Sequence, residues 1–154
     1  MSYIEEIRQK IGHERLIYLG AGVIVYQKGK ILLQKRKDNG AWALHAGGVE
    51  WGEQLCETAR RELFEETGLV AQNMEFFGLY SGEDRVMTYP NGDQIYMPNA
   101  FYLCTAFSKT LVPQKEEVLD LKWFSTDDLP QKIHLPNRRV IKDFLEFIEK
   151  KELK

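Results

Sequence analysis

One stretch of 23 residues decides the fold: Gly47-Gly48-Val49-Glu50-Trp51-Gly52-Glu53-Gln54-Leu55-Cys56-Glu57-Thr58-Ala59-Arg60-Arg61-Glu62-Leu63-Phe64-Glu65-Glu66-Thr67-Gly68-Leu69. Its second part predicts an α-helix over Gln54–Thr67. The apolar residues Leu55, Ala59 and Leu63 recur there at helical spacing. Gly68 follows as a C-terminal cap. The glycines upstream of the helix allow backbone groups to approach a ligand closely.

Three carboxylates share one face of this predicted helix. Glu62, Glu65 and Glu66 stand at positions i, i+3 and i+4. Like charges at this spacing cost roughly 0.2–0.5 kcal/mol per pair, and partial burial raises the cost. A divalent cation removes that cost, and Mg²⁺ prefers carboxylate oxygens while leaving room for substrate phosphates. The alternative is a solvated acidic face balanced by Arg60 and Arg61.

The spacing of the whole segment is more specific than its acidic residues alone. Five residues separate Gly47 from Glu53, and seven separate Glu53 from Arg61. The other fixed positions are Glu62, Leu63, Glu65, Glu66, Gly68 and Leu69. This constellation resembles the Nudix box of the Nudix hydrolase (MutT-like) family, with every defining position filled. The flanking stretches that also resemble the family are Ala21–Arg36, Trp42–Leu44 and Trp123–Pro130.

The resemblance implies an α/β (α+β) fold, a Nudix-like α/β/α sandwich with a mixed central β-sheet. It also implies hydrolysis of a diphosphate linkage attached to a nucleoside or a similar group, with Mg²⁺ or Mn²⁺ as the cofactor. This chemistry is mostly positioning and charge neutralisation. Metal ions lower the pKa of bound water and clamp phosphate oxygens, so no nucleophilic side chain is required.

The resemblance assigns the metal site to four residues of the box. Glu62, Glu65 and Glu66 match the positions that bind the metal, and the backbone carbonyl of Gly47 is a further expected ligand. Glu66 or Glu65 is also expected to help activate the attacking water.

Arg61 and Glu53 are the predicted supporting pair. Arg61 matches the arginine that orients the glutamates, and Glu53 is expected to be its partner, with a direct metal role as the weaker alternative. The chain departs from the family just before these positions. Family members often carry Pro-Gly-Gly, whereas this chain has His45-Ala46-Gly47. We interpret His45 as an ordinary loop histidine; the alternative is a phosphate contact or a general base.

Four residues outside the box are candidates for contacting substrate. Many Nudix enzymes place another carboxylate near the metals from a separate loop, and Glu116 and Glu117 are its candidates here. The equally weighted alternative is a pair of solvated loop acids. Lys35 and Arg36 end the strand before the box and are candidates for binding phosphates, although solvated cations are common at strand ends.

The rest of the chain is expected to complete a single domain over residues 1–154, because one core usually holds ~100–200 residues. A helix is predicted over about residues 2–10, and an amphipathic helix over about residues 137–152. Residues 89–96 predict a hairpin that either covers the substrate or contacts a second copy. The other expected elements are strands over 16–26, 31–35, 74–81, 95–107 and 118–124, a loop over 46–51 and a short helix over 126–129.

Composition excludes several classes of protein. The formal net charge of −2 provides no basic patch for nucleic acid or for an anionic membrane. The apolar stretch Tyr18–Tyr26 is too short to span a bilayer, and the N-terminus lacks a secretory signal. Cys56 and Cys104 form no metal motif, and both are interpreted as core residues. His134 is interpreted as a surface residue. We expect a cytoplasmic protein that forms no stable complex with nucleic acid or membrane.

The box indicates the reaction and leaves the substrate open. Nucleoside triphosphates, including dNTPs in a housecleaning role, are the favoured partners. ADP-ribose or a nucleotide sugar is the alternative. A different class of protein, a Nudix module that binds nucleotides without catalysis, often lacks a box glutamate, whereas all three are present here. RNA decapping is disfavoured by the missing basic patch. Homodimers are frequent in the family, so a homodimer is weakly favoured.

Overall fold

A seven-stranded mixed sheet forms the centre of the molecule in a computed structural model that describes residues 1–108, 110–112 and 116–151. Its main path runs in the order β12-β3-β2-β10-β7, with β4 paired to β3 and β5 paired to β2. Only β2 and β10 run parallel among these pairs. The strands are β2 (Gly20–Gln27), β3 (Lys30–Arg36), β4 (Trp42–Ala43), β5 (His45–Gly48), β7 (Glu75–Tyr80), β10 (Asn99–Cys104) and β12 (Val118–Ser125).

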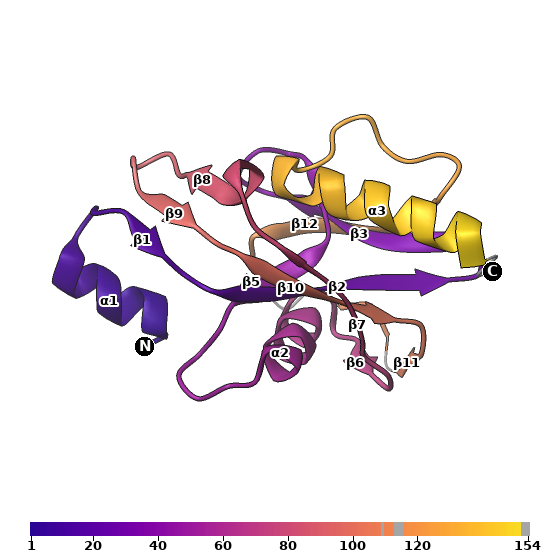
Figure 1. Ribbon diagram of the computed structural model, residues 1–154, viewed down its shortest axis with the longest axis horizontal. Helices are drawn as coiled ribbons and strands as arrows, with labels where there is room; N and C mark the ends of the chain where they lie inside the picture. Colours follow the sequence, from indigo (N-terminus) through magenta and orange to yellow (C-terminus); the bar gives the residue numbers. More distant parts are fainter. Residues whose placement is uncertain (109, 113–115, 152–154) are drawn as a thin grey trace.

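Two helices cover opposite faces of this sheet. Helix α2 (Leu55–Thr67) lies on one face and helix α3 (Leu135–Lys151) on the other (Figure 1). The predicted α/β/α sandwich with a mixed central sheet is therefore confirmed. Within the described residues, none of the helices combines the length and apolarity needed to cross a membrane.

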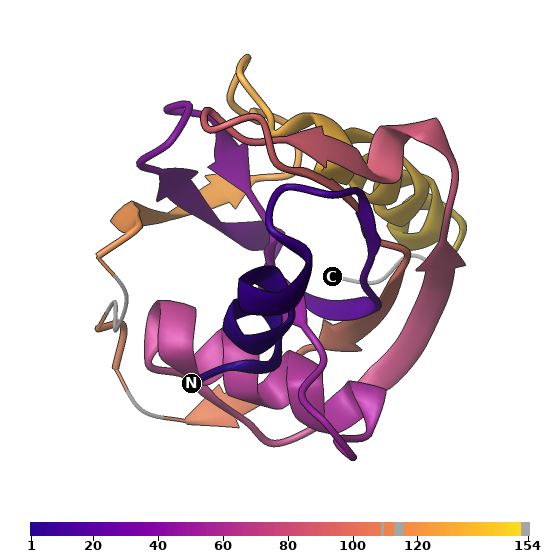
Figure 2. The same ribbon diagram turned by 90° about the vertical axis from the view of Figure 1, so that its left-hand side faces the viewer.

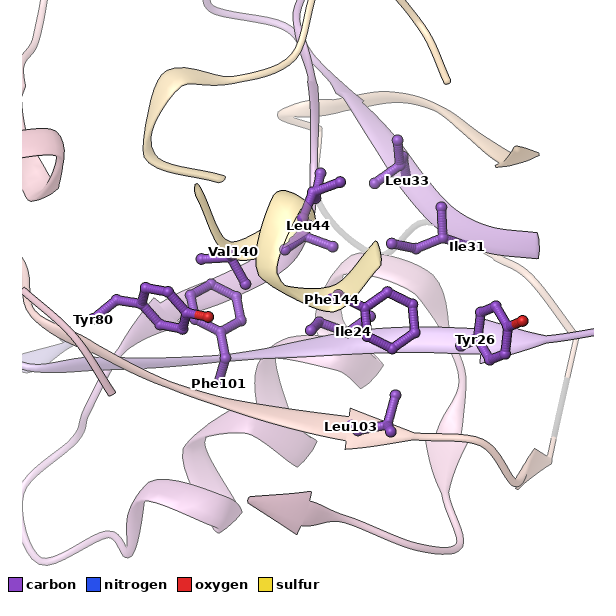
Figure 3. Packing of buried hydrophobic residues seen from close by; sticks show 11 residues of the cluster. Ile24, Tyr26, Ile31, Leu33, Leu44, Tyr80, Phe101, Leu103, Val140 and Phe144 are labelled. Carbon is purple, nitrogen blue, oxygen red and sulfur yellow. The ribbon is translucent and has the colours of Figure 1, made fainter. Parts of the chain in front are cut away.

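The central strand β2 shows why both faces need a helix. All but its last residue are buried, and its side chains alternate between the two cores. Val23 and Val25 belong to the cluster that includes Leu63 of α2. Ile24 belongs to the cluster beneath Phe144 of α3, which Figure 3 shows at close range. The near-continuous apolar run of β2 thus supplies buried side chains to both hydrophobic cores.

A smaller sheet and the first helix lie at one end of the molecule, on the left in Figure 1 and facing the viewer in Figure 2. Strands β1, β9 and β8 form this sheet, with β1 parallel to β9 and β8 antiparallel to it. β8 and β9 form the predicted hairpin, and residues 89–93 are the turn between them. The remaining elements are α1 (Tyr3–Ile11), β1 (Leu16–Ile17), β6 (Val70–Ala71), the 3-10 helix η1 (Glu83–Arg85), β8 (Val86–Thr88), β9 (Gln94–Tyr96) and β11 (Phe107–Ser108).

The long strands expected over residues 16–26 and 95–107 are each divided. β1 and β2 replace the first, and β9, β10 and β11 replace the second. Pro98 lies at the break between β9 and β10, where it cannot donate a ladder hydrogen bond. The register is nevertheless continuous across both breaks. Leu16 lies opposite Ile95 and Gly20 opposite Asn99, a separation of 79 residues in both pairs.

The loop expected over residues 46–51 is wrong in its first half. Residues 45–48 form β5, which pairs with β2 from Gly20 to Val23. The short helix expected over residues 126–129 is also wrong. The chain turns there instead, with the Asp127 amide donating to the Ser125 hydroxyl at 3.2 Å. α3 begins two residues earlier than expected, and residue 152, where we expected it to end, lies outside the described residues.

Candidate active site

The box segment folds back on itself so that β5 lies against the glutamate-bearing face of α2. Helix α2 ends at Gly68, whose φ of 80° is favourable for glycine and whose amide donates to the Phe64 carbonyl at 2.8 Å. Gly47 of β5 lies directly against Glu62. A Cβ atom at Gly47 would sit 2.1 Å from Cδ of Glu62, so any other residue would displace this carboxylate. The exposed fraction of Glu62 is 5%.

Arg61 gathers the acidic residues on one side of this face. Its Nε and Nη2 donate to the two carboxylate oxygens of Glu53 at 2.8 and 3.0 Å. Its Nη1 donates to Glu62 at 3.0 Å and to Glu65 at 2.9 Å. Nη2 also donates to the Gly48 carbonyl at 2.9 Å. These five bonds use all five N–H donors of the guanidinium.

The electrostatics of this group follow from its hydrogen bonds. The Arg61 guanidinium holds the pKa of Glu53 at about 2, well below its ordinary value of 4.5. The hydrogen bond to Glu53 in turn raises the pKa of Arg61. Arg61 therefore remains a cation and Glu53 an anion throughout the physiological range. The predicted pairing of these two side chains is present in the structure.

Glu66 is held by a different set of partners. Its Oε1 accepts from Nε2 of Gln34 at 2.7 Å and from the backbone amide of Ala46 at 3.1 Å. Both side chains are buried, with 6% of Gln34 and 7% of Glu66 exposed. Sequence reasoning missed Gln34. The only signal for it in the sequence is its position. It is a polar residue directly after the apolar run 31–33, and it lies on the same face of the strand as Leu32.

His45 is neither a loop residue nor accessible to a phosphate group. It lies in β5 and is completely buried. Its Nε2 contacts the Leu32 carbonyl at 3.0 Å, and its Nδ1 contacts Nε2 of Gln34 at 2.9 Å. Burial lowers the pKa of His45 to about 4, so the ring is neutral at pH 7. The expectation of an ordinary loop histidine is therefore wrong, because β5 carries this side chain into the interior.

The oxygen donors of this face match a hard divalent cation by chemical type. Glu62 and Glu66 lie beside consecutive residues of β5, and carboxylates and backbone carbonyls are the ligands that Mg²⁺ prefers. Among the described residues, however, no group of three or more His, Cys, Asp or Glu side chains has the arrangement of a metal site. Hydrogen bonds instead divide the predicted ligands, because Glu62 and Glu65 accept from Arg61 whereas Glu66 accepts from Gln34.

A pocket of about 500 Å³ opens at Glu66. Arg36 and Glu117 line it, so the structure brings these two candidates to the box helix. Arg36 also donates to both carboxylate oxygens of Asp38, at 2.9 and 2.6 Å. The side chains of Lys35 and Glu116 are not among the residues that line this pocket. The lining residues within the described part of the chain are Gln34, Arg36, Lys37, Asp38, Glu66, Tyr89, Glu117 and Val118.

Tyr89 is an aromatic lining residue that the sequence did not single out for this pocket. It directly follows β8, where its amide donates to the Asp93 carbonyl at 2.9 Å, and it also lines a neighbouring pocket with His134. His134 is 8% exposed, so the surface position expected for it is wrong. Cys56 is only half-buried and therefore not the core residue we expected, whereas Cys104 is buried as predicted.

Comparison with known proteins decides the family. Residues 17–144 match the family described as "NUDIX domain". The chain belongs to the Nudix family. An ADP-ribose pyrophosphatase of Methanocaldococcus jannaschii is 33% identical over 79% of this chain and 69% of its own length. Nucleoside triphosphatase NudI of Escherichia coli is 34% identical over 69% of this chain and 80% of its own length.

Solved structures of Nudix proteins share the fold. A MutT NUDIX hydrolase from Burkholderia pseudomallei has a TM-score of 0.71 and 29% identity, covering 82% of this chain and 96% of its own. The NUDIX domain of Shewanella oneidensis NrtR, crystallised with ADP-ribose, has a TM-score of 0.68 and 22% identity, covering 96% and 99%. The predicted family and reaction class, a Nudix hydrolase of phosphorus anhydrides, are therefore confirmed. Nudix hydrolases in general use divalent metal ions.

Proposed function

We propose that this Nudix hydrolase cleaves the diphosphate linkage of nucleoside triphosphates with Mg²⁺, or Mn²⁺ in its place. The observation that carries the proposal is the position of Glu66, which belongs to the box helix and also lines a 500 Å³ pocket with Arg36. A carboxylate and a cation in one pocket suit a phosphate substrate that arrives with a metal ion. We place the reaction in the cytoplasm.

The metal ligands are proposed to be the carboxylates of Glu62, Glu65 and Glu66 and the carbonyl of Gly47. When bound, the cation supplies positive charge that offsets the charge of the phosphate oxygens. Glu66 or Glu65 accepts the proton of the attacking water at a carboxylate oxygen. Arg61 acts on this reaction indirectly, because it fixes the carboxylates that perform it.

The substrate is proposed to enter beside β3 and β12. Arg36 lies in the pocket and binds a phosphate oxygen, partly in exchange for Asp38. Glu117 also lines this pocket, beside β3, and is the candidate for the additional carboxylate. Substitution of Glu117 by Gln is expected to lower turnover several-fold, and Glu116→Gln is its matched control because Glu116 does not line the pocket.

ADP-ribose or a nucleotide sugar is the second candidate substrate, favoured by the ADP-ribose pyrophosphatase relative. The test is a phosphate-release panel of dNTPs, NTPs, ADP-ribose, NADH and nucleotide sugars with and without Mg²⁺. After the incubation, pyrophosphate released from the triphosphates is split by an inorganic pyrophosphatase. The phosphomonoester products of the other substrates are treated with a phosphatase, so that every cleavage releases phosphate. Metal-dependent turnover of one group supports the proposal and identifies the substrate class.

The panel also separates catalysis from simple binding. If no substrate is turned over but nucleotide binding is measurable, the result would favour a non-catalytic nucleotide-binding module. Sedimentation of the same preparation tests the separate expectation of a homodimer.

A further inference from the structure

A chain of buried hydrogen bonds leads from the backbone of β3 to the carboxylate of Glu66. The ring of His45 lies between the Leu32 carbonyl, 3.0 Å from Nε2, and the Gln34 amide nitrogen, 2.9 Å from Nδ1. The same Gln34 nitrogen lies 2.7 Å from Oε1 of Glu66. The chain therefore connects β3, β5 and α2 through three buried side chains.

The hydrogens of this network can be assigned from its acceptors. The Leu32 carbonyl only accepts, so Nε2 of His45 carries the hydrogen and Nδ1 of the neutral ring presents a lone pair. The Gln34 amide nitrogen has two hydrogens, and its two neighbours, the imidazole Nδ1 and the Glu66 carboxylate, are both acceptors. One hydrogen goes to each. A reversed Gln34 amide would place its oxygen against two acceptors, so its orientation is fixed.

We propose that His45 and Gln34 are positioning residues that hold the carboxylate of Glu66 in the orientation required for metal binding. The inference rests on the proposed function, in which Glu66 is a metal ligand. Partners behind a metal ligand fix its orientation, and their loss typically costs 10–100-fold in metal affinity or activity. His45 acts through Gln34, because its lone pair fixes the amide that donates to Glu66.

Two substitutions of His45 separate this role from simple packing. The Oδ1 of His45→Asn falls near the position of Nδ1 and keeps an acceptor for Gln34, but loses the donor to Leu32. The amide of His45→Gln reaches the position of Nε2 and keeps that donor, but loses the acceptor for Gln34. Each variant thus breaks one of the two bonds of the ring.

The probe is Mn²⁺ alone, titrated into the metal-free full chain and followed by electron paramagnetic resonance. His45→Gln is expected to weaken Mn²⁺ binding about 10–100-fold, as is Gln34→Leu, whereas His45→Asn stays within about threefold of wild type. His134→Gln is the matched control, because His134 is also buried but contacts Asn39 and not Glu66. This control is expected to lower the melting temperature and leave Mn²⁺ binding unchanged.

A second readout follows the orientation of Glu66 in the metal-free chain. The ¹³C resonance of the Glu66 carboxyl group is expected to move in His45→Gln and to remain in place in His45→Asn. Equal Mn²⁺ affinities and equal carboxyl shifts in the two His45 variants would overturn the positioning role. If wild type neither binds Mn²⁺ nor hydrolyses any substrate, the proposed function fails and the positioning role for metal binding falls with it. The carboxyl shift then reports only whether His45 orients Glu66.

Discussion

Two groups of side chains hold the glutamates of α2, and they use opposite physical means. In the first, which we call the Arg61 cluster, one partly exposed cation binds Glu53, Glu62 and Glu65. In the second, the Gln34 network, the buried neutral side chains of Gln34 and His45 hold Glu66. About 30% of the Arg61 side chain is exposed, whereas His45 is completely buried.

The difference shows which disturbances each group resists. The Arg61 cluster depends on charge, so salt and acid weaken it, but its long side chain can adjust to small displacements. The Gln34 network depends on the positions of donors and acceptors, so salt hardly affects it while a change of shape breaks it. One carboxylate thus has a rigid neutral support, and its neighbours have an adaptable charged one.

The largest expected effect comes from Glu66 itself. Glu66→Gln is expected to lower turnover by about 10²–10³-fold or more, the loss typical when a group that stabilises charge is removed. The fold should survive, because the Gln oxygen can still accept from Gln34 and Ala46. Steady-state kinetics on the best substrate measure the loss, and the exposed Glu75→Gln serves as the control. Near-wild-type turnover of Glu66→Gln would contradict the catalytic role assigned to Glu66.

Arg61→Lys tests the charged group. Lysine keeps the charge but has three donors instead of five, and it cannot bind both oxygens of Glu53 side by side. Turnover is expected to fall about 10–100-fold. Arg60→Lys on the same helix should remain close to wild type, because the bond found for Arg60 goes to the Ala71 carbonyl, away from the glutamates. Equal effects of the two substitutions would contradict a special role for the Arg61 cluster.

Acid should reduce the stability contribution of the buried histidines at a higher pH than that of the Arg61–Glu53 pair. Burial lowers the pKa of both His45 and His134 to about 4, while the unfolded chain takes up these protons below about 6.5. The free energy of unfolding should therefore fall as pH drops from 6.5 to about 4, by up to ~1.4 kcal/mol per pH unit for each histidine. The Arg61–Glu53 contribution persists above 4.5 and is lost only as pH approaches 2.

Urea unfolding at several pH values between 7 and 4.5 measures this dependence. His134→Gln should remove the share of one histidine from the slope, and Glu53→Gln should leave the slope above pH 4.5 unaltered. An unchanged slope in His134→Gln would show that its protonation is not linked to folding.

Salt should produce the smallest effect. The stability difference between wild type and Arg61→Met should shrink by about 0.2–1 kcal/mol in 1 M NaCl, because partly exposed ion pairs are screened. The difference between wild type and Gln34→Leu should not change, since neutral donors hold that part of the site. Urea unfolding at low and high salt compares the two variants. A similar salt response in both variants would contradict the distinction between a charged Arg61 cluster and a neutral Gln34 network.

The sequence predicted the charged group far better than the neutral one. Arg61, Glu62 and Glu65 lie at helical spacing on α2, and Glu53 comes just before that helix within the same contiguous pattern. Gln34 and His45 belong to different strands, so their meeting depends on how β3 and β5 lie over α2, which no local spacing reveals. Their contact is visible only after the sheet is assembled.

The boundaries of the elements show the same limit. The apolar periodicity located α2, β3, β7 and β12 to within about one residue, but it merged β1 with β2 and β9 with β10 and β11. It missed β5 because glycines are unfavourable in strands. Gly47 and Gly48 are tolerated there because neighbouring side chains occupy the space of their missing Cβ atoms. Tyr89 was likewise assigned to a hairpin without a location, since the pocket it lines depends on contacts with distant β3.

The uninterrupted register of β1–β2 with β9–β10 has a kinetic consequence. Every pair in this parallel ladder joins residues 79 positions apart, so no turn can bring its first contact together. The chain must close a long loop before any rung forms, a step whose entropic cost rises slowly with length but delays folding. Once one rung exists, each neighbour follows at little further cost. Refolding should therefore show late, cooperative protection of residues 20–25 and 99–104 against hydrogen exchange, after the β2–β3 hairpin has formed.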